Sequence, residues 1–321
     1  MVSPKEKPGR TCPRHYRYAA SVFAREPTFE AESIYVAGGL YGNVHALEAV
    51  LELARSDGAT LVFNGDFNWF NVDAEGFSAI NGAVLQHVAL RGNVETEIAG
   101  EDTGAGCGCG YPEWVGDPEV DRSNEILRRL RETARGFPDL RARLGALPMH
   151  LVAEVGGVRI GIVHGDAESL AGWEFSQEAM RARPERAQAL LAGAGVGVFA
   201  CSHTCLPVMQ EFALPRGAAL VANNGAAGMP NFRGTRFGLA TRIALRSSPD
   251  ALYRARIGGV HVEAVPIRYD HDAWIAHFDR IWPANSPARF SYRKRIVSGP
   301  AYEAEQAGRI IAPGRVLSRA A

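Results

Sequence analysis

The sequence predicts an α/β fold, and three observations support this prediction. Short apolar segments alternate with longer segments in which apolar residues recur every three or four positions, as expected for alternating strands and helices. Most of the apolar segments end in Gly, Asn, Asp or His. The composition, with 46% hydrophobic and 22% charged residues in a chain of 321 residues, is typical of a globular protein with a full core.

The first predicted strands and helices follow one another directly. In chain order, we expect a buried strand at 33–37, a helix at 46–53, a buried strand at 60–63, a helix at 77–88 and a short strand at 88–90. This order is typical of βαβ units, in which neighbouring strands run parallel.

The second half of the chain mixes fewer helices with more strands. We expect helices at 123–144, about 176–192 and about 270–280, a hairpin of strands at 151–155 and 158–163, a strand at 196–200, and short strands near 207–212, 219–222, 237–244, 251–257 and 260–266.

The same pattern predicts how the chain is divided. We expect residues 1–32, which have no clear period, to be an N-terminal extension that packs on the domain at 33–282. A loop rich in Gly and Cys at 98–120 interrupts that domain, and loops of this length are usually functional or mobile. Residues 283–321 are predicted to be a basic C-terminal tail without strong periodicity.

The charge balance and the cysteine count exclude some classes of function. Lys and Arg number 35, as do Asp and Glu, so the zero net charge argues against a sequence-specific nucleic-acid or membrane-surface binder. No apolar run is long enough to span a membrane, and no secretory signal is recognisable. Five cysteines, an odd number, make a disulfide framework improbable and favour the cytoplasm. The oligomeric state stays open.

Four polar residues at predicted strand ends are candidates for a metal site. Asp66, Asn93, His164 and His203 each follow an apolar segment. Because ligand sites in α/β sheets lie at the carboxyl ends of strands, we expect these side chains to converge. One carboxylate, one amide oxygen and two imidazoles suit divalent Zn, Mn or Fe.

The order of the motifs resembles the calcineurin-like metallophosphoesterases, especially their small bacterial phosphodiesterase-like branch. That family has the pattern D-x-H-G-N, then G-D, then G-N followed by H or another residue and D or E, then H-G and G-H-x-H. The corresponding segments are Gly39-Leu40-Tyr41-Gly42-Asn43, Gly65-Asp66, Gly92-Asn93-Val94-Glu95, His164-Gly165 and Ser202-His203-Thr204-Cys205. The resemblance covers about residues 33–280. It implies a four-layer αββα sandwich of two mixed β-sheets flanked by helices.

The resemblance also implies two metal positions, of which one is altered here. The positions for the first metal carry Gly39, Tyr41, Asp66 and Cys205, and only Asp66 matches the family. The positions for the second metal carry Asp66, Asn93, His164 and His203, and all four match. We therefore expect one or two divalent or mixed-valence ions of Mn, Fe or Zn, with the four matching residues as the catalytic and metal-binding set.

Several further residues have two interpretations. Tyr41 and Cys205 are candidate ligands of an unorthodox second metal site. Alternatively, Tyr41 stacks on the substrate, and Cys205 is a small buried apolar side chain. Cys107 and Cys109 either join that metal site or form a thiol pair in a flexible loop.

Two residues are candidates for binding the phosphate of a substrate. Asn43 either caps the following helix or contacts phosphate, as the same position does in the family. Arg233, which follows the Gly-rich turn at 222–230, is a further candidate for phosphate binding.

Three classes of function follow from these observations. We favour a metal-dependent phosphoesterase, in which a metal-activated water attacks a phosphomonoester or phosphodiester. Its substrate would be a phosphorylated small molecule or a nucleotide. The alternatives are a catalytically degenerate protein that binds a phosphorylated ligand or a partner, and a thiol-containing metal or redox protein on the same scaffold.

Overall fold

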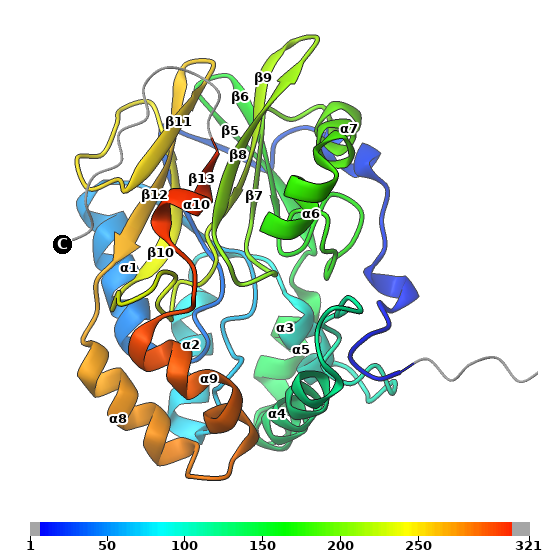
Figure 1. Cartoon of the computed structure of the whole chain (residues 1–321), viewed down its shortest axis with the longest axis vertical. Helices are drawn as coiled ribbons and strands as arrows, with labels where there is room; N and C mark the ends of the chain where they lie inside the picture. Colours follow the sequence, from blue (N-terminus) through cyan, green and yellow to red (C-terminus); the bar gives the residue numbers. More distant parts are fainter. Residues whose placement is uncertain (1–6, 310–321) are drawn as a thin grey trace, which may run out of the picture.

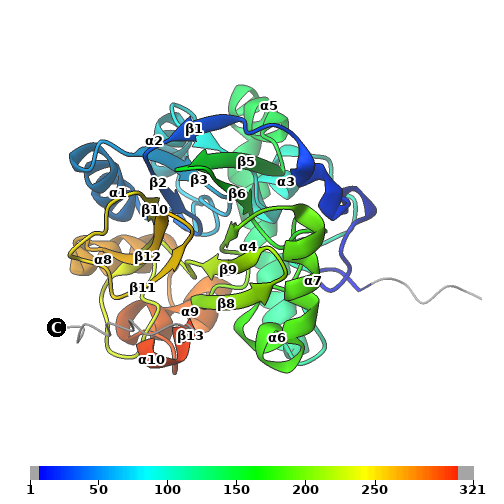
Figure 2. The ribbon, with the colours of Figure 1, turned by 90° about the horizontal axis from the view of Figure 1, so that it is seen from above.

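The structure is a computed structural model that describes residues 7–309. Two β-sheets stack face to face, and helices cover the outer face of each (Figures 1 and 2). This confirms the α/β class that the sequence predicted and the αββα sandwich that the family resemblance implied. Among the described residues, no helix is long and apolar enough to cross a membrane.

One sheet contains the first βαβ units. Its strand order is β11-β12-β10-β2-β3-β4. The strands are β2 (Ser33–Ala37), β3 (Thr60–Phe63), β4 (Val88–Ala89), β10 (Gly238–Ala244), β11 (Tyr253–Ile257) and β12 (Val260–Ile267). As the sequence predicted, β2, β3 and β4 run parallel, whereas β10, β12 and β11 add antiparallel neighbours.

The other sheet has the order β1-β5-β6-β7-β9-β8-β13. Its strands are β1 (Phe29–Ala31), β5 (His150–Val155), β6 (Val158–Val163), β7 (Val198–Cys201), β8 (Val208–Leu214), β9 (Gly217–Asn223) and β13 (Gly308–Arg309). The predicted hairpin is present as antiparallel β5 and β6, and β6, β7 and β9 run parallel. Both sheets are therefore mixed.

The alternation of side chains along the strands produces three apolar layers. Along β2, Ile34 and Val36 pack between the two sheets, whereas Tyr35 and Ala37 face the helices on the outer side. This is the two-residue period of a strand that is buried on both faces. A third layer lies between β5–β9 and the helices that cover them.

Ten α-helices are described. They are α1 (Val44–Ser56), α2 (Ala74–Val84), α3 (Asn93–Ala99), α4 (Asp117–Arg135), α5 (Pro138–Ala146), α6 (Gln177–Ala182), α7 (Pro184–Ala194), α8 (His271–Ile281), α9 (Pro287–Ser298) and α10 (Ala304–Ala307). Helices α1, α2 and α8 pack on the six-stranded sheet, and α6 and α7 pack on the seven-stranded sheet.

Two helices predicted as continuous are each broken by a proline. The segment at 123–144 is divided into α4 and α5 before Pro138, and the segment at 176–192 into α6 and α7 before Pro184. Proline lacks the amide hydrogen that a helix interior needs, and it disfavours helical conformation in the residue before it. Both prolines consequently start a new helix.

The two ends of the described chain contain elements that the sequence did not predict. Residues 7–28 form two short 3-10 helices, Arg14–Tyr16 and Ala20–Ala24, before β1 pairs with β5. Beyond residue 282, α9 packs against α4 and α8, and β13 extends the sheet beside β8. Only Ala288 and Ile296 of α9 are buried, which explains why this segment shows no helical period in the sequence.

Candidate metal centre

The four predicted ligands converge because the carboxyl ends of strands from both sheets meet. Asp66 follows β3, and Asn93 is the first residue of α3, just after β4. His164 directly follows β6, and His203 follows β7. All four side chains are buried. Strand ends that are far apart in sequence thus come together at one point.

The distances within this cluster are short. The Nε2 atom of His164 lies 3.3 Å from Oδ1 of Asp66 and 3.1 Å from Oδ1 of Asn93. The Nδ1 atom of His203 lies 3.1 Å from the same Nε2 atom. One ligand atom from each of Asp66, His164 and His203 can be chosen so that all three lie within 4.8 Å of one another.

The hydrogen bonds on the outside of the cluster set its chemistry. The Nδ1 atom of His164 lies 2.9 Å from the carbonyl oxygen of Asn64, and Nε2 of His203 lies 2.9 Å from that of Cys109. Carbonyls only accept, so these nitrogens carry the protons, and the other ring nitrogens present lone pairs to the cluster. Asn93 likewise donates its Nδ2 to a loop carbonyl, which leaves Oδ1 facing inward. When both imidazoles are neutral, these groups present four acceptors to one point, which fits a divalent cation. Burial by itself lowers the pKa of His164, but the Asp66 carboxylate raises it above its usual value, so without a cation a proton on Nε2 takes the place of the metal.

The charge states agree with this interpretation. Burial and the neighbouring His164 lower the pKa of His203 to about 3, so this imidazole is neutral at physiological pH. Burial by itself would raise the pKa of Asp66, but attraction to His164 and His203 lowers it below its usual value. The cluster therefore contains a carboxylate and at least one neutral imidazole, as a metal site requires.

A second layer of contacts holds the backbone of Asp66 in place. The carboxylate of Glu95 is fully buried and accepts hydrogen bonds from the backbone N–H groups of Asp66 (2.7 Å), Gly92 (3.0 Å) and Asn68 (3.2 Å). Burial, followed by repulsion from Asp66, raises the pKa of Glu95 to about 7. The sequence analysis assigned no role to Glu95.

A tyrosine–cysteine pair stands at two of the positions of the first metal. The hydroxyl of Tyr41 lies 2.9 Å from Sγ of Cys205, and burial raises the pKa of both groups, so they are neutral. A Cβ atom built at Gly39 would lie only 2.8 Å from Cζ of Tyr41. The tyrosine ring thus fills the space beside Gly39, the position that corresponds to the first aspartate of the D-x-H-G-N motif.

Both residues of this pair and the neighbouring Asp66 have strained backbones. Tyr41, Asp66 and Cys205 have φ angles of 55°, 53° and 62°, in the left-handed region that non-glycine residues rarely adopt. In the described part of the chain, only one other non-glycine residue has a positive φ. Strain of this kind is concentrated at functional sites.

The predicted cysteine ligands in the loop are bonded to each other. Cys107 and Cys109 form a disulfide, contrary to the expectation from the odd cysteine count, and a disulfide sulfur is not a thiolate ligand. Their backbone carbonyls instead accept from Asn93 and His203, both at 2.9 Å. The loop therefore contacts the cluster through its backbone.

The two predicted phosphate-binding residues lie outside the pocket. Asn43 is buried and caps α1 by accepting from the backbone N–H of Ala46, while its Nδ2 donates to Gly228. Arg233 is exposed and pairs with Glu303. The structure thus supports the capping role of Asn43 and gives Arg233 no place at the cluster.

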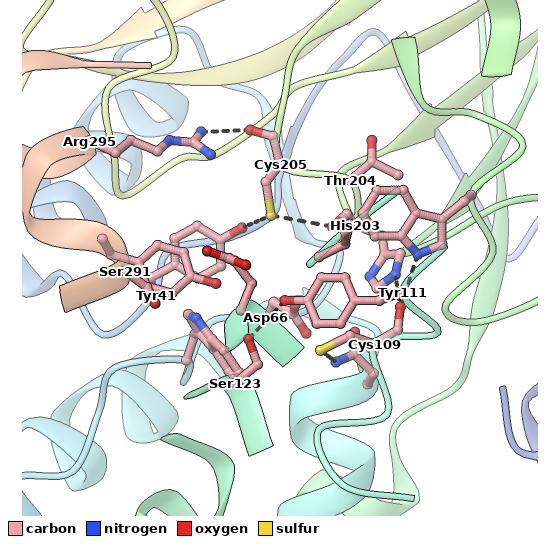
Figure 3. Close-up of a pocket in the computed structure, with 16 residues that line it drawn as sticks. Tyr41, Asp66, Cys109, Tyr111, Ser123, His203, Thr204, Cys205, Ser291 and Arg295 are labelled. Carbon is pink, nitrogen blue, oxygen red and sulfur yellow. Dashed lines mark hydrogen bonds between the residues drawn. The ribbon is translucent and has the colours of Figure 1, made fainter. Parts of the chain in front are cut away.

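A cavity of about 250 Å³ opens directly onto the cluster (Figure 3). Asp66, Asn93 and His203 are among the residues that line it. Its lining includes Tyr41, Trp69, Tyr111, Trp173, Tyr292 and Arg295. The sequence analysis missed the last five because they come from loops and from α9, where only tertiary contacts show which residues reach the cluster.

Comparisons with known proteins identify the fold. No protein-family model matches this sequence, and no curated protein matches it either. Among solved structures, a hypothetical protein of Pyrococcus horikoshii OT3 is 16% identical, with a TM-score of 0.53, and the match covers 84% of this chain and 99% of that one.

A metallophosphoesterase of Sphaerobacter thermophilus is also 16% identical, with a TM-score of 0.51, and the match covers 84% of this chain and 100% of that one. These two similarities show the fold of the chain. The chain shares the fold of these two structures, one of which is described as a metallophosphoesterase.

Proposed function

We propose that this protein is a metal-dependent phosphoesterase that hydrolyses a phosphomonoester or a phosphodiester. The observation that carries the proposal is the inward-facing set of acceptors on Asp66, Asn93, His164 and His203. The fold shared with a protein described as a metallophosphoesterase supports it. A cavity beside these atoms provides room for a substrate.

These four residues would hold one divalent ion of Mn, Fe or Zn. When bound, such an ion activates water and withdraws charge from a phosphoryl group. The cluster contributes one carboxylate, so the loaded site is positive and attracts phosphate. Arg295 adds a positive charge to the cavity wall, and its position is held by donation to the carbonyl of Cys205 (2.6 Å).

We propose one ion per chain rather than two, because Tyr41 and Cys205 stand at the positions of the first metal. Their side chains hydrogen-bond to each other at 2.9 Å, and a second cation would have to break this contact and displace a proton. A mononuclear site lacks the clamp on attacking and leaving oxygens that two metals provide. We therefore expect modest turnover.

The test measures metal content and hydrolysis together. Protein purified without chelator is analysed for metal, and hydrolysis of bis(p-nitrophenyl) phosphate is followed with and without added Mn²⁺. We expect about one ion per chain and metal-dependent turnover, both lost in His203→Ala and retained in His87→Ala, an exposed control. Metal-independent turnover, or turnover retained in His203→Ala, would refute the proposal.

A second candidate function is ligand binding without turnover. The observation that favours it is the loss of the first metal position to Tyr41 and Cys205. Tight binding of phosphate without hydrolysis of any phosphoester would select it. A redox role is the third possibility, and it would require metal content to change when the Cys107–Cys109 disulfide is reduced.

Four further expectations stay predictions. They are a nucleotide as the substrate, a cytoplasmic location, the possibility of an oligomer, and the boundaries of the domain and its terminal segments.

A further inference from the structure

The cavity beside the cluster is lined mainly by aromatic side chains from separate segments. Trp69 follows β3, Tyr111 lies in the loop before α4, Trp173 follows β6, and Tyr292 belongs to α9. The rings of Tyr111 and Trp173 are 5.9 Å apart, and those of Trp69 and Tyr292 are 6.4 Å apart. Two pairs of contacting rings thus belong to the cavity wall.

The aromatic wall is continuous with the metal cluster. The ring of Trp173 contacts that of His203 edge to face, with centroids 5.5 Å apart. The indole Nε1 of Trp173 donates to the carbonyl of Cys109 (2.9 Å), which also accepts from His203. A phosphate held at the cluster would therefore place its substituent against this wall.

Most polar groups of the wall already have partners. The hydroxyl of Tyr111 bonds Ser123 (3.0 Å), and Thr204 accepts from Asn223 (2.9 Å). Ser291 accepts from Arg122. A ligand with many hydroxyl groups, such as a sugar, would gain few new hydrogen bonds here, whereas a planar apolar group could contact the rings.

The charges of the wall suit a phosphate close to the cluster. Arg295 is the one Lys or Arg among the lining residues, and its Nε and Nη2 donate to the carbonyls of Pro230 and Cys205. The acid Glu119 pairs with Arg122 (2.7 Å). The cavity, at about 250 Å³, is below the usual range for drug-sized ligands of roughly 300–1,000 Å³. It fits one ring system rather than an extended ligand.

Building on the proposed function, we propose that this cavity is a subsite for a planar aromatic group carried by the phosphoester. The phosphate lies at the cluster, and an aryl ring or a nucleobase packs against Trp173 and its neighbours. Aromatic stacking of this kind corresponds to roughly 5- to 150-fold in affinity for each ring.

The test compares two ligands that cannot be hydrolysed, phenylphosphonate and methylphosphonate. Binding to the metal-loaded protein is measured by calorimetry, so the result does not depend on turnover. We expect phenylphosphonate to bind at least about tenfold more tightly, in line with one stacked ring. Equal affinities of the two ligands, or no binding of either, would overturn the subsite.

Variants then locate the subsite. Trp173→Ala should cost phenylphosphonate several-fold more affinity than methylphosphonate, and metal content measured on the same variant shows whether the cluster is intact, since Trp173 contacts His203. Tyr292→Leu, in the other pair of contacting rings, is the second variant should the first fail to fold or lose its metal. Phe290→Ala is the matched control, since Phe290 lies on the same helix but is 75% exposed. An equal loss for both ligands in Trp173→Ala would refute a subsite role.

Competition identifies the source of the ring. Displacement of phenylphosphonate by adenosine but not by phenol supports a nucleotide, and the reverse supports an aryl phosphate. Either result supports the subsite. If glycerol displaces phenylphosphonate as well as adenosine and phenol do, the subsite is contradicted. Failure of the separate hydrolysis assay would refute the proposed function without altering these binding results.

Discussion

The packing of Tyr41 against Gly39 can be tested by a double-mutant cycle. Gly39 has a φ of 67°, and an added Cβ would lie 2.8 Å from Cζ and 2.9 Å from the hydroxyl oxygen of Tyr41. Gly39→Ala should therefore cost about 1–2 kcal/mol of backbone strain. Displacing the buried ring should add about 1–3 kcal/mol.

Removing the ring should cancel the second contribution. In a Tyr41→Ala background, Gly39→Ala should cost only the strain, although Tyr41→Ala alone lowers the unfolding free energy by about 3–5 kcal/mol. The four proteins, unfolded in urea, should show a coupling energy of about 1–3 kcal/mol. Gly58→Ala is the matched control, because Gly58 has a φ of 61° and no atom within 4 Å of the added Cβ.

Additive free-energy changes, within about 0.5 kcal/mol, would refute the reasoning. They would mean that the ring does not occupy the space beside Gly39 and that the first metal position is open. A coupling of about 1–3 kcal/mol would mean that a larger side chain at Gly39 clashes with the ring of Tyr41. The cycle therefore tests, through stability alone, whether the ring occupies the space beside Gly39.

Three further predictions follow from individual contacts. Glu95→Ala should lower the unfolding free energy by about 2–4 kcal/mol, as measured in urea, because it leaves buried N–H groups without an acceptor; a change below 0.5 kcal/mol would contradict this. The double variant Cys107→Ser, Cys109→Ser should bind metal about 10- to 100-fold more weakly in equilibrium dialysis, because the carbonyls of these two residues orient the ligands Asn93 and His203. An unchanged metal affinity would show that the disulfide is not needed to position them. Burial, aided by Arg25, lowers the pKa of His150 from 6.5 to about 4, so the fold holds it neutral. Between pH 6.5 and 4 the unfolded chain binds a proton at His150 that the folded protein does not, so the unfolding free energy should fall as pH drops through this range. His150→Gln should flatten this part of the plot of unfolding free energy against pH, and identical plots for the two proteins would refute the assignment.

Local patterns in the sequence were sufficient for the strands between β2 and β12 and for the four cluster residues. Strands such as β2 and β3 are short apolar runs between glycines and polar residues, and their type does not depend on distant contacts. Asp66, His164 and His203 could be proposed together because parallel strands bring their carboxyl ends to one edge. The stacking of the two sheets was an implication of the family resemblance, and the structure confirms it.

The wall of the cavity and the state of the first motif were decided by tertiary structure. Helix α9 buries only two residues, so its sequence has no apolar stripe, yet packing against α4 and α8 brings Tyr292 and Arg295 to the cluster. The disulfide depends on the local fold of a glycine-rich loop, which residue spacing does not specify. The pairing of Tyr41 with Cys205 joins residues 164 positions apart. Sequence periodicity reports which faces are buried, whereas the neighbour of each side chain is set by how distant segments pack.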